Sequence, residues 1–393
     1  MKILMIAPEP FFEPRGTPFS ILGRLKALSR LGHSVDLLTY HVGDDVVIEG
    51  IRILRTPQLR FIREVPIGPS YRKVLLDILL VVNAFIMLVK ERYDLVHTHE
   101  EASIFGTVLA KVFGIRHLYD FHSSIPQVMR NFVSRQFLLL IPALEWIERL
   151  VVNASDGVIA ISPALRDYVR TINKSVPIMV IENIIEALDQ ESITAEKISE
   201  FENTYSQFNG KKIVLYTGTF EPYQGLELLI SCAERVLQHR KDVIFALVGG
   251  KKHQIDKLRE IVVGLGISSH FYFTGIRPPA EMPLFMNIAQ TLVSPRLNGN
   301  NTPLKIYSYL QSGKPIVATN ITAHNQILND DIAILVDPDP DSMAQAILSV
   351  LDDSSLATKL GARARLYFKS RCSFREYIDK TEEILDMVYE RRS

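Results

Sequence analysis

The amino-acid sequence predicts an α/β protein made of two doubly wound domains, each a parallel sheet with helices on both faces, that face a central cleft. Two observations predict this fold. Short apolar, β-branched runs alternate with amphipathic helical stretches along most of the chain. The alternation weakens from Ala187 to Asn209, where the residues are polar and acidic, and starts again at Lys211. Ligands bind such sheets where the strands end, so a cleft between two of them suits a ligand.

The first half of the chain contains apolar runs that are typical of strands buried on both faces. They are KILMIAP from Lys2, SVDLLTY from Ser34, YDLVHTH from Tyr93, RHLYDFH from Arg116, DGVIAIS from Asp156 and VPIMVIENIIE from Val176. Residues 17–33, which separate the first two runs, predict a helix that ends at Gly32. This order of strand and helix predicts parallel strands with right-handed crossovers.

The second half repeats the pattern from a fresh first strand. Its runs are KKIVLYTGTF from Lys211, VIFALVGG from Val243, HFYFTGI from His270, QTLVSP from Gln290, PIVATN from Pro315 and AILVD from Ala333. We therefore expect one domain over residues 1–186 and another over residues 187–374, with a hinge near Asn183 to Asn209. The last helix, at about residues 375–393, is expected to pack back on the first domain.

The composition narrows the class of protein. Lys and Arg total 44, as do Asp and Glu, so the charge balance does not suggest a nucleic-acid partner. The only two cysteines, Cys232 and Cys372, suggest a reducing compartment, and so a cytoplasmic protein, rather than a disulfide scaffold. The opening run MKILMIAPEP is too short for a signal peptide and lacks a small-residue cleavage site, so we interpret it as a strand.

Two segments come closest to a membrane-spanning helix. The segment from Val74 to Val89 is interrupted by Asp77 and Asn83, and that from Phe137 to Val152 by a proline and two glutamates. A spanning helix needs about 20 predominantly apolar residues. We therefore predict half-buried helices for both, and a peripheral contact with the inner face of a membrane stays open as the alternative.

The stretch RLNGNNTPLKIYSYLQSGKPIVATN, which begins at Arg296, is typical of a loop that runs into a helix and holds phosphate. Thr302 is predicted as the N-cap of that helix, Pro303 as its first residue and Gly313 as its end. Free N–H groups at a helix start bind anions. The residues expected to meet the phosphate are Arg296, Asn300, Asn301, Thr302 and Lys305. A capped surface helix with a polar turn is the alternative interpretation.

Taken in order, the motifs resemble those of the retaining glycosyltransferases of family 4, which have the GT-B fold of two Rossmann-like domains. The motifs are LSRLGHSVDLLT, YDLVHTH, DFHSS, DGVIAIS, VIENIIE, VLYTGTFEPYQGLELLI, ALVGG, FTGIRPPAEMPLFM and TPLKIYSYLQSGKPIVAT. They extend from about Lys2 to about Asp353, and it is their order that makes the set specific. The resemblance implies an acceptor-side first domain and a second domain that binds a nucleotide-sugar as a substrate, with no cofactor.

In the first domain the resemblance assigns roles to two regions. The loop after the first strand, which is expected to approach the diphosphate, contains Arg15, Gly16 and Thr17. His122 resembles the histidine that contacts the sugar and the reacting centre, and Asp120 is expected to orient it, although Asp120 could equally cap a loop. Retaining enzymes of this fold need no obvious protein nucleophile, so we expect His122 to act by position and electrostatics.

In the second domain the chain departs from the family pattern at four positions. Asn300 and Ser308 stand where the family commonly has two glutamates that contact the donor sugar and the ribose. Beyond Gly218, which the diphosphate is expected to approach, Thr219 and Gln224 stand where the family often has an arginine and a lysine. Neutral side chains keep hydrogen bonds but lose charge, so the donor affinity or donor identity is expected to differ from the common pattern.

These residues predict a metal-independent glycosyltransferase that moves a sugar from a nucleotide-sugar donor to a saccharide or lipid-linked acceptor. A catalytically degenerate nucleotide- or sugar-binding protein, or another GT-B activity, is the alternative. Arg277 is expected either to reach the phosphates or to be solvated. His97 and His99 alternate on one strand and so invite a zinc interpretation, but the strand fits the family without a metal, and none is expected.

Overall fold

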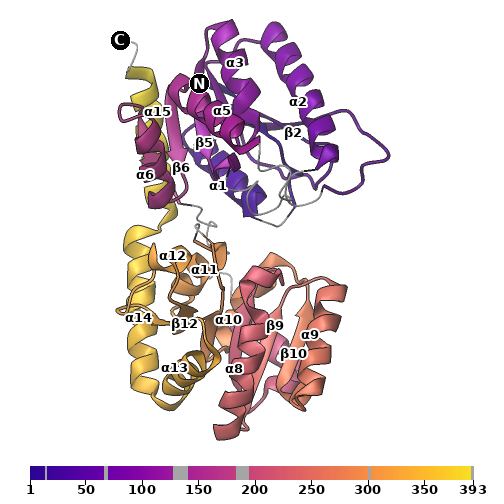
Figure 1. The fold of residues 1–393 in the computed structure, drawn as a ribbon, viewed down its shortest axis with the longest axis vertical. Coiled ribbons are helices and arrows are strands. Elements are labelled where there is room, and N and C mark those ends of the chain that lie inside the picture. The colour runs from indigo at the N-terminus through magenta and orange to yellow at the C-terminus, as the bar shows by residue number, and fades with distance from the viewer. Residues whose placement is uncertain (14–15, 66–69, 127–139, 183–193, 300–301, 391–393) are drawn as a thin grey trace. The chain divides into compact units, whose positions relative to one another are not determined.

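The structure is a computed structural model, and it describes the chain apart from residues 14–15, 66–69, 127–139, 183–193, 300–301 and 391–393. Contacts divide the chain into two compact units (Figure 1). One unit is Met1–Ile184 with Phe374–Ser393, and the other is Ile185–Ser373. The named strands of each unit form one parallel sheet, so the predicted α/β class with two doubly wound sheets is confirmed.

The sheet of the first unit has seven strands among the described residues, in the order β3-β2-β1-β4-β5-β6-β7. They are β1 (Lys2–Ala7), β2 (Ser34–Thr39), β3 (Ile51–Arg55), β4 (Leu95–His99), β5 (Arg116–Phe121), β6 (Gly157–Ala160) and β7 (Ile178–Val180). The strand order reverses between β1 and β4, the point at which such sheets bind ligands. The sequence analysis missed β3, because this edge strand contains two arginines and no fully buried residue, and so lacks a continuous apolar run.

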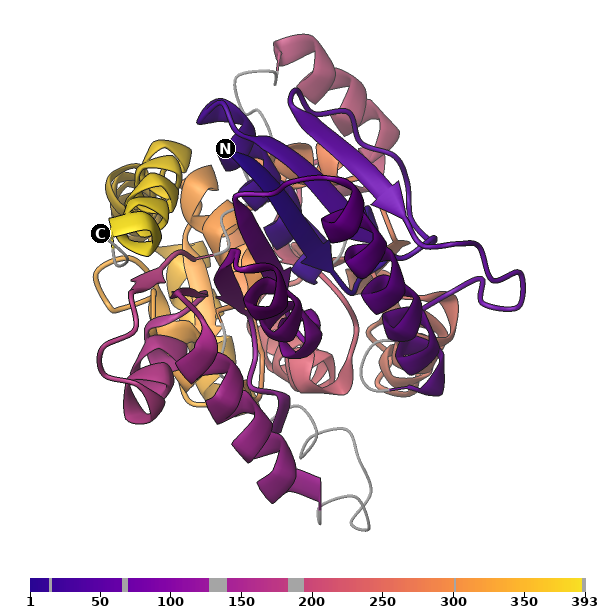
Figure 2. The same ribbon diagram turned by 90° about the horizontal axis from the view of Figure 1, so that it is seen from above.

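Helices cover both faces of this sheet (Figures 1 and 2). They are α1 (Gly16–Arg30), α2 (Tyr71–Lys90), α3 (Ala102–Phe113), α5 (Ile141–Ala154), α6 (Pro163–Ile172) and α15 (Phe374–Glu390). Helices α1 and α15 pack together on one face, whereas α2, α3 and α5 lie side by side on the other. Because strand residues alternate between faces, Leu4 and Ile6 pack under α2 and α3, whereas His97 and Asp120 point toward α1 and α15.

Helix α2 is apolar on both of its faces. Leu76, Leu80, Ala84 and Leu88 are buried against the sheet, so the predicted half-buried helix is confirmed here. The exposed residues of α2, apart from Lys90 at its end, are Tyr71, Val74, Leu75, Ile78, Val82, Phe85, Ile86 and Val89. We call these eight side chains the α2 outer face. A helix at a protein surface normally presents polar residues to solvent, so this face is unusual. Within the described residues, every helix falls short of the length and apolarity that crossing a bilayer requires.

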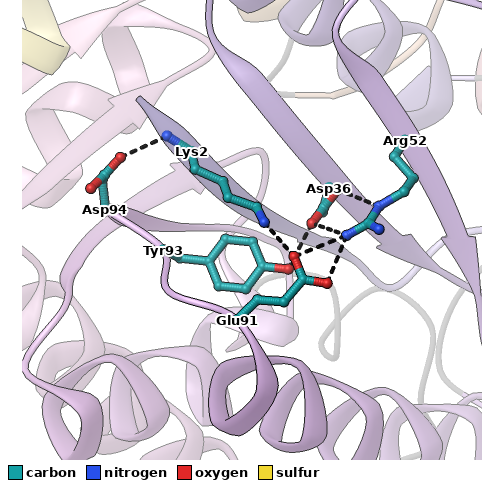
Figure 3. Close-up of polar contacts among 6 residues, drawn as sticks. All are labelled: Lys2, Asp36, Arg52, Glu91, Tyr93 and Asp94. Carbon is teal, nitrogen blue, oxygen red and sulfur yellow. Dashed lines mark hydrogen bonds and ion pairs between the residues drawn. The ribbon is translucent and has the colours of Figure 1, made fainter.

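A polar network fixes the C-terminal end of α2 to the sheet (Figure 3). Arg52 on β3 donates from Nε and Nη2 to the two carboxylate oxygens of Asp36 on β2, at 2.8 and 2.6 Å. Arg52 also donates to Glu91, which follows α2 and pairs with Lys2. The Tyr93 hydroxyl donates to Asp36 at 2.7 Å. These residues lie at the amino-terminal edge of the strands, so we interpret the network as a structural clamp rather than as a ligand site.

Helix α15 docks on the sheet of the first unit, although it follows α14 of the second unit in the chain. Arg116 on β5 donates to the carbonyl oxygens of Val388 and Tyr389, the latter at 2.7 Å. The Tyr389 hydroxyl in turn donates to the carbonyl oxygen of Asp94 at 3.0 Å. These contacts make the last helix part of the layer that covers β5, β6 and β7.

The sheet of the second unit has six strands in the order β10-β9-β8-β11-β12-β13 among the described residues. They are β8 (Lys212–Thr217), β9 (Val243–Val248), β10 (Phe271–Gly275), β11 (Thr291–Ser294), β12 (Ile316–Thr319) and β13 (Ile334–Val336). The α-helices are α7 (Ala195–Thr204), α8 (Leu226–His239), α9 (Lys252–Gly264), α10 (Met282–Ile288), α11 (Leu304–Ser312), α12 (Thr322–Asn325), α13 (Pro340–Asp352) and α14 (Ser354–Arg371). The strand order reverses between β8 and β11, and Cys232 and Cys372 are both buried.

Candidate functional site

A cluster of buried polar side chains lies where β4 and β5 end in the first unit. It consists of Arg24, His97, His99, Asp120 and His122, none of which is more than 4% exposed, and we call it the Asp120 cluster. Strand alternation points His97, His99 and Asp120 to the face that α1 and α15 cover. His122 directly follows the last residue of β5, and Arg24 reaches the group from α1.

The carboxylate of Asp120 lies at the centre of this cluster. Its Oδ2 accepts a hydrogen bond from Arg24 Nε at 2.9 Å and lies 3.4 Å from His97 Nε2. Its Oδ1 lies 3.3 Å from His122 Nε2. The same His122 nitrogen lies 2.9 Å from Nδ1 of His99, so one of these two rings donates to the other. The structure thus brings together Asp120 and His122, the pair to which the sequence analysis assigned catalytic roles.

Burial and one ion pair set the charges in the Asp120 cluster. Burial lowers the pKa of His97 and His122, and it holds the pKa of His99 well below its usual value, so the three rings are neutral near pH 7. Burial by itself would raise the pKa of Asp120, but Arg24 and the histidines outweigh it and hold that pKa well below its usual range. The cluster therefore contains one positive and one negative charge, which balance.

The spacing of His97, His99 and Asp120 raises the question of a metal, because one ligand atom from each lies within 4.8 Å of the others. However, Asp120 Oδ2 already accepts from the Arg24 guanidinium, and a bound cation would lie beside that positive charge. The sequence analysis expected no metal here, and we assign none.

In the second unit, Lys305 on α11 extends to the end of β8. Its Nζ lies 3.7 Å from the centroid of the Tyr216 ring and donates to Oε1 of Gln224 at 3.2 Å. Gly218 has φ +137°, and a Cβ placed there would lie 3.4 Å from this nitrogen, so glycine lets the backbone approach the cation. Burial, and then the charge of Arg296, lower the pKa of Lys305 well below its usual value. A bound anion would reverse that effect.

Arg296, which closely follows β11, folds back over its own loop. Its Nε donates to the carbonyl oxygen of Asn298 at 2.7 Å, and its Cζ lies 5.2 Å from the centroid of the Tyr223 ring. Gly299 has φ +135°, which favours glycine, and a Cβ there would lie 2.2 Å from Nη2 of Arg296, so a side chain would displace the guanidinium. Burial lowers the pKa of Arg296. Lys305 and Arg296 thus make this end of the second sheet cationic.

The start of α11 differs from the prediction at two positions. The sequence predicts Thr302 as the N-cap and Pro303 as the first helical residue, whereas the N-cap is Pro303, and no side chain caps the helix. Proline disfavours a helical conformation for the residue before it, and Pro303 itself has an extended ψ of 133°, so the helix begins at Leu304. The predicted end is correct, because Gly313 is left-handed at φ 71°. Thr302 therefore precedes the free N–H groups of the first turn without capping them.

The other predicted site residues are spread more widely. Ser308 lies half-buried on α11, one turn beyond Lys305. Gly16 and Thr17 form the start of α1, where a Cβ on Gly16 would meet no atom within 4 Å. Arg277 donates to the Tyr205 hydroxyl and lies 3.7 Å from Glu281, so its contacts differ from those of Lys305. Three residues lie outside the described part of the chain: Arg15, Asn300 and Asn301.

Two contributors to these sites were missed by the sequence analysis. Arg24 was hidden in a helix of apolar pattern, although it is the sole charge between Pro18 and Leu25 and lies on the buried stripe, which is a usable signal. Tyr216 resembled an ordinary residue of a buried strand, and nothing in the sequence pairs it with Lys305, which is far away in the chain. A hollow of about 520 Å³, lined by Gly250, Thr274, Gly275 and Ile276 among others, was also not foreseen.

Two doubly wound parallel sheets, with cationic and histidine side chains where their strands end, define a class of α/β ligand-binding proteins. Residues 16–187 match the family described as Glycosyltransferase Family 4, and residues 197–367 match that described as Glycosyl transferases group 1. The chain belongs to this family of glycosyltransferases, the group 1 or family 4 enzymes of GT-B fold, as the motifs predicted. Enzymes of this family are retaining and metal-independent.

Individual relatives are distant. The alpha-monoglucosyldiacylglycerol synthase of Streptococcus pneumoniae is 22% identical over 89% of this chain and 78% of its own length. The phosphatidyl-myo-inositol mannosyltransferase of Mycolicibacterium smegmatis is 24% identical over 93% of this chain and 88% of its own. A match to the Bacillus subtilis glycosyltransferase YtcC, 27% identical, spans 45% of this chain and only 46% of that relative.

Among solved structures, Anabaena HepE in complex with UDP has a similar fold. Its TM-score is 0.75 at 16% sequence identity, and the alignment covers 98% of this chain and all of that one. At such low identity the likeness establishes the GT-B fold and leaves the ligand of this chain to be argued from its own residues.

Proposed function

We propose that the second unit binds the diphosphate of a nucleotide-sugar donor at Lys305 and the start of α11. One observation carries this proposal. The Lys305 ammonium is half-buried and contacts an aromatic ring and a neutral amide oxygen, with Arg296 as a second cation nearby. Two cations beside a helix N-terminus form an anion receptor, and a diphosphate would place negative charge opposite them. The same charge stabilises a departing diphosphate during transfer.

The flanking residues extend this donor site. Ser308, one turn along α11, is proposed to contact the ribose, and Gly218 to let the backbone approach the phosphates. The hollow near Gly275 and Ile276 suits a nucleobase held through backbone groups, because it opens at the ends of β9 and β10. Seven further residues remain proposed donor contacts, on the strength of the sequence pattern and the family resemblance: Asn300, Asn301, Thr302, Arg277, Arg15, Gly16 and Thr17.

On the acceptor side, we propose that His122 positions the donor sugar and stabilises the reacting centre, with Asp120 as its orienting partner. The buried, neutral ring can donate or accept a hydrogen bond without carrying a charge of its own. The pair Asp120–His122 thus supplies a polar contact whose geometry the surrounding cluster restricts.

The acceptor is proposed to be a lipid or lipid-linked sugar, presented at the inner face of a membrane. The names of two relatives, a diacylglycerol-glycolipid synthase and a phosphatidyl-inositol mannosyltransferase, support a lipid. The α2 outer face supports contact with a bilayer, because it is apolar along five turns. Anionic headgroups would be attracted by three exposed basic residues, which lie in the last turns of α2 and α3 or just beyond α2: Lys90, Lys111 and Arg92.

The test of function is sugar transfer, measured with a panel of nucleotide-sugars, with and without lipid acceptors, in the presence of EDTA. We expect transfer that needs a lipid acceptor and survives chelation. A protein that binds UDP and other nucleoside diphosphates tightly yet transfers no sugar from any donor would overturn the proposal.

Membrane contact is tested separately by flotation with vesicles rich in phosphatidylglycerol. The Ile78→Glu and Val82→Glu double variant should lose binding, because it places two charges on the α2 outer face. Val263→Glu is the matched control, since Val263 on α9 of the second unit is an exposed apolar residue too, at 64% against 54% for Ile78 and 49% for Val82. Equal vesicle binding by the double variant and the control would show that the α2 outer face does not contact the membrane.

A further inference from the structure

Arg24 connects three elements of the first unit through one buried guanidinium. Its Nε donates to Asp120 on β5 at 2.9 Å, and its Nη1 donates to Oγ1 of Thr381 on α15 at 3.2 Å. Its Cζ lies 4.9 Å from the centroid of the Tyr377 ring, also on α15. The arginine is fully buried, so these contacts, rather than water, determine where its charge lies.

The hydrogen-bond chemistry of Thr381 fits this arrangement. Its hydroxyl proton is used in a bond to the carbonyl oxygen of Tyr377 at 2.7 Å, one turn earlier in α15. The oxygen lone pairs of Thr381 are therefore left to accept from Arg24. The hydroxyl and the Tyr377 ring thus present α15 to the guanidinium as an acceptor and a π face.

We propose that Arg24, held by α15, is a positioning residue for Asp120 and His122, so that the C-terminal helix completes the reactive end of the first unit. The proposal rests on the function proposed for His122. Because Arg24 binds Oδ2 of Asp120, the carboxylate cannot rotate freely, and its Oδ1 stays 3.3 Å from His122 Nε2. A small rotation of that carboxylate would move the histidine away from the sugar.

The electrostatics agree with this geometry. The groups that face His122 are Asp120, Arg24, His97 and His99, from β5, α1 and β4. The charge of Arg24 lowers the pKa of Asp120 and opposes protonation of all three histidines, in addition to the effect of burial. Arg24 therefore fixes both the orientation of the carboxylate and the neutral state of the rings.

The first arm of the test uses kinetics of the full chain. Arg24→Gln should lower kcat by about 100-fold, the cost of a misplaced reacting group, while the KM for the donor changes little because the donor cations lie in the second unit. Arg24→Lys, which keeps the charge, should restore part of the rate. Thr381→Val should lower kcat by roughly fivefold, the equivalent of one hydrogen bond.

Tyr389→Phe is the matched control on the same helix. It removes the hydrogen bond that α15 donates to the carbonyl oxygen of Asp94, without touching Arg24. We expect its kcat to be unchanged. If Thr381→Val and Tyr389→Phe lower kcat and the melting temperature equally, α15 is only a structural support and the proposal is wrong.

A second arm needs no activity, so it separates this proposal from the proposed function. The titration of His122 is followed by NMR in protein with labelled histidine, with His122→Gln used to assign the signal. Arg24→Gln should raise the titration midpoint of His122, because a neighbouring positive charge is lost, whereas Tyr389→Phe should leave it unchanged. An unchanged midpoint in Arg24→Gln overturns the proposal. Absent sugar transfer together with a raised midpoint would reject only the proposed function.

Discussion

The two units place their buried cations in opposite surroundings. In the first unit, Arg24 is paired with Asp120, and three neutral histidines surround the pair. In the second unit, Lys305 contacts the Tyr216 ring and the amide oxygen of Gln224, and the charge of Arg296 lowers its pKa further, beyond the effect of burial. The charges of the first group balance within the protein, whereas we propose that a ligand supplies the negative charge of the second.

This difference indicates a division of labour. A balanced ion pair holds its neighbours in one geometry and suits the positioning of a reacting centre. An excess of positive charge raises the free energy of an empty site. An anionic ligand lowers that free energy, so anion binding is favoured. Gln224 contributes to the second case, since it accepts a hydrogen bond from Lys305 without neutralising its charge and donates from Nε2 to Oγ1 of Thr219 at 3.5 Å.

The largest effect is expected when the charge balance between Arg24 and Asp120 in the first unit is removed. Asp120→Ala should lower the free energy of unfolding by about 3–5 kcal/mol, because it leaves the Arg24 guanidinium buried without its counter-charge. Urea denaturation at pH 7 measures the change. The double variant Arg24→Met with Asp120→Leu should recover much of the loss, since neither charge then remains. A small loss in Asp120→Ala would mean that the pair is not balanced as described.

Removing the Lys305 charge in the second unit should reduce ligand affinity rather than stability. Lys305→Met should leave the free energy of unfolding almost unchanged, because the half-buried charge that it removes has no anionic partner among the described residues. Its affinity for UDP should fall by about 1.5–3 kcal/mol, the value of a charged hydrogen bond. Calorimetry with Lys257→Met as the control measures this, since Lys257 is an exposed lysine that pairs with Glu227 on the same unit. An undiminished UDP affinity of Lys305→Met would contradict the proposal that Lys305 binds the diphosphate.

The two groups should also differ in their response to pH. The pKa of Lys305 lies well below its ordinary value of 10.5 in the free protein, and a bound diphosphate favours the ammonium and raises it. UDP binding should therefore take up protons, and the affinity should fall as the pH rises through the depressed pKa. Titration calorimetry in buffers of different ionisation enthalpy detects the uptake, which Lys305→Met should abolish. Proton uptake that persists in that variant would place the titrating group elsewhere.

The smallest expected effect concerns the ribose. Ser308→Ala should weaken UDP binding by about 0.5–1.5 kcal/mol, the value of one neutral hydrogen bond, with little change in kcat because the ribose is remote from the bond that breaks. Ser312→Ala is the matched control, since Ser312 ends the same helix and its hydroxyl donates to the carbonyl oxygen of Tyr309. Equal UDP affinities of the two variants would mean that residues other than Ser308 contact the ribose.

The parts of the fold that were predictable share one property. Strands such as β1, β4 and β8 are buried on both faces, so each is a continuous apolar run that the sequence displays. The edge strand β3 has polar neighbours and exposed residues, so its run is broken by arginines and was missed. The start of α11 was displaced because the Pro303 backbone, and not the capping tendency of Thr302, decides where the helix begins.

The sequence by itself determined the family, the two parallel sheets and the residues at their strand ends, because local apolar patterns and ordered motifs are written along the chain. Only the tertiary structure decided which of those residues meet. Arg24 and Thr381 are separated by 357 positions, and Lys305 and Gln224 by 81, yet each pair is in hydrogen-bonding contact. Such contacts depend on how α1, α15 and α11 pack on the sheets, and packing depends on side chains throughout each unit rather than on the local run.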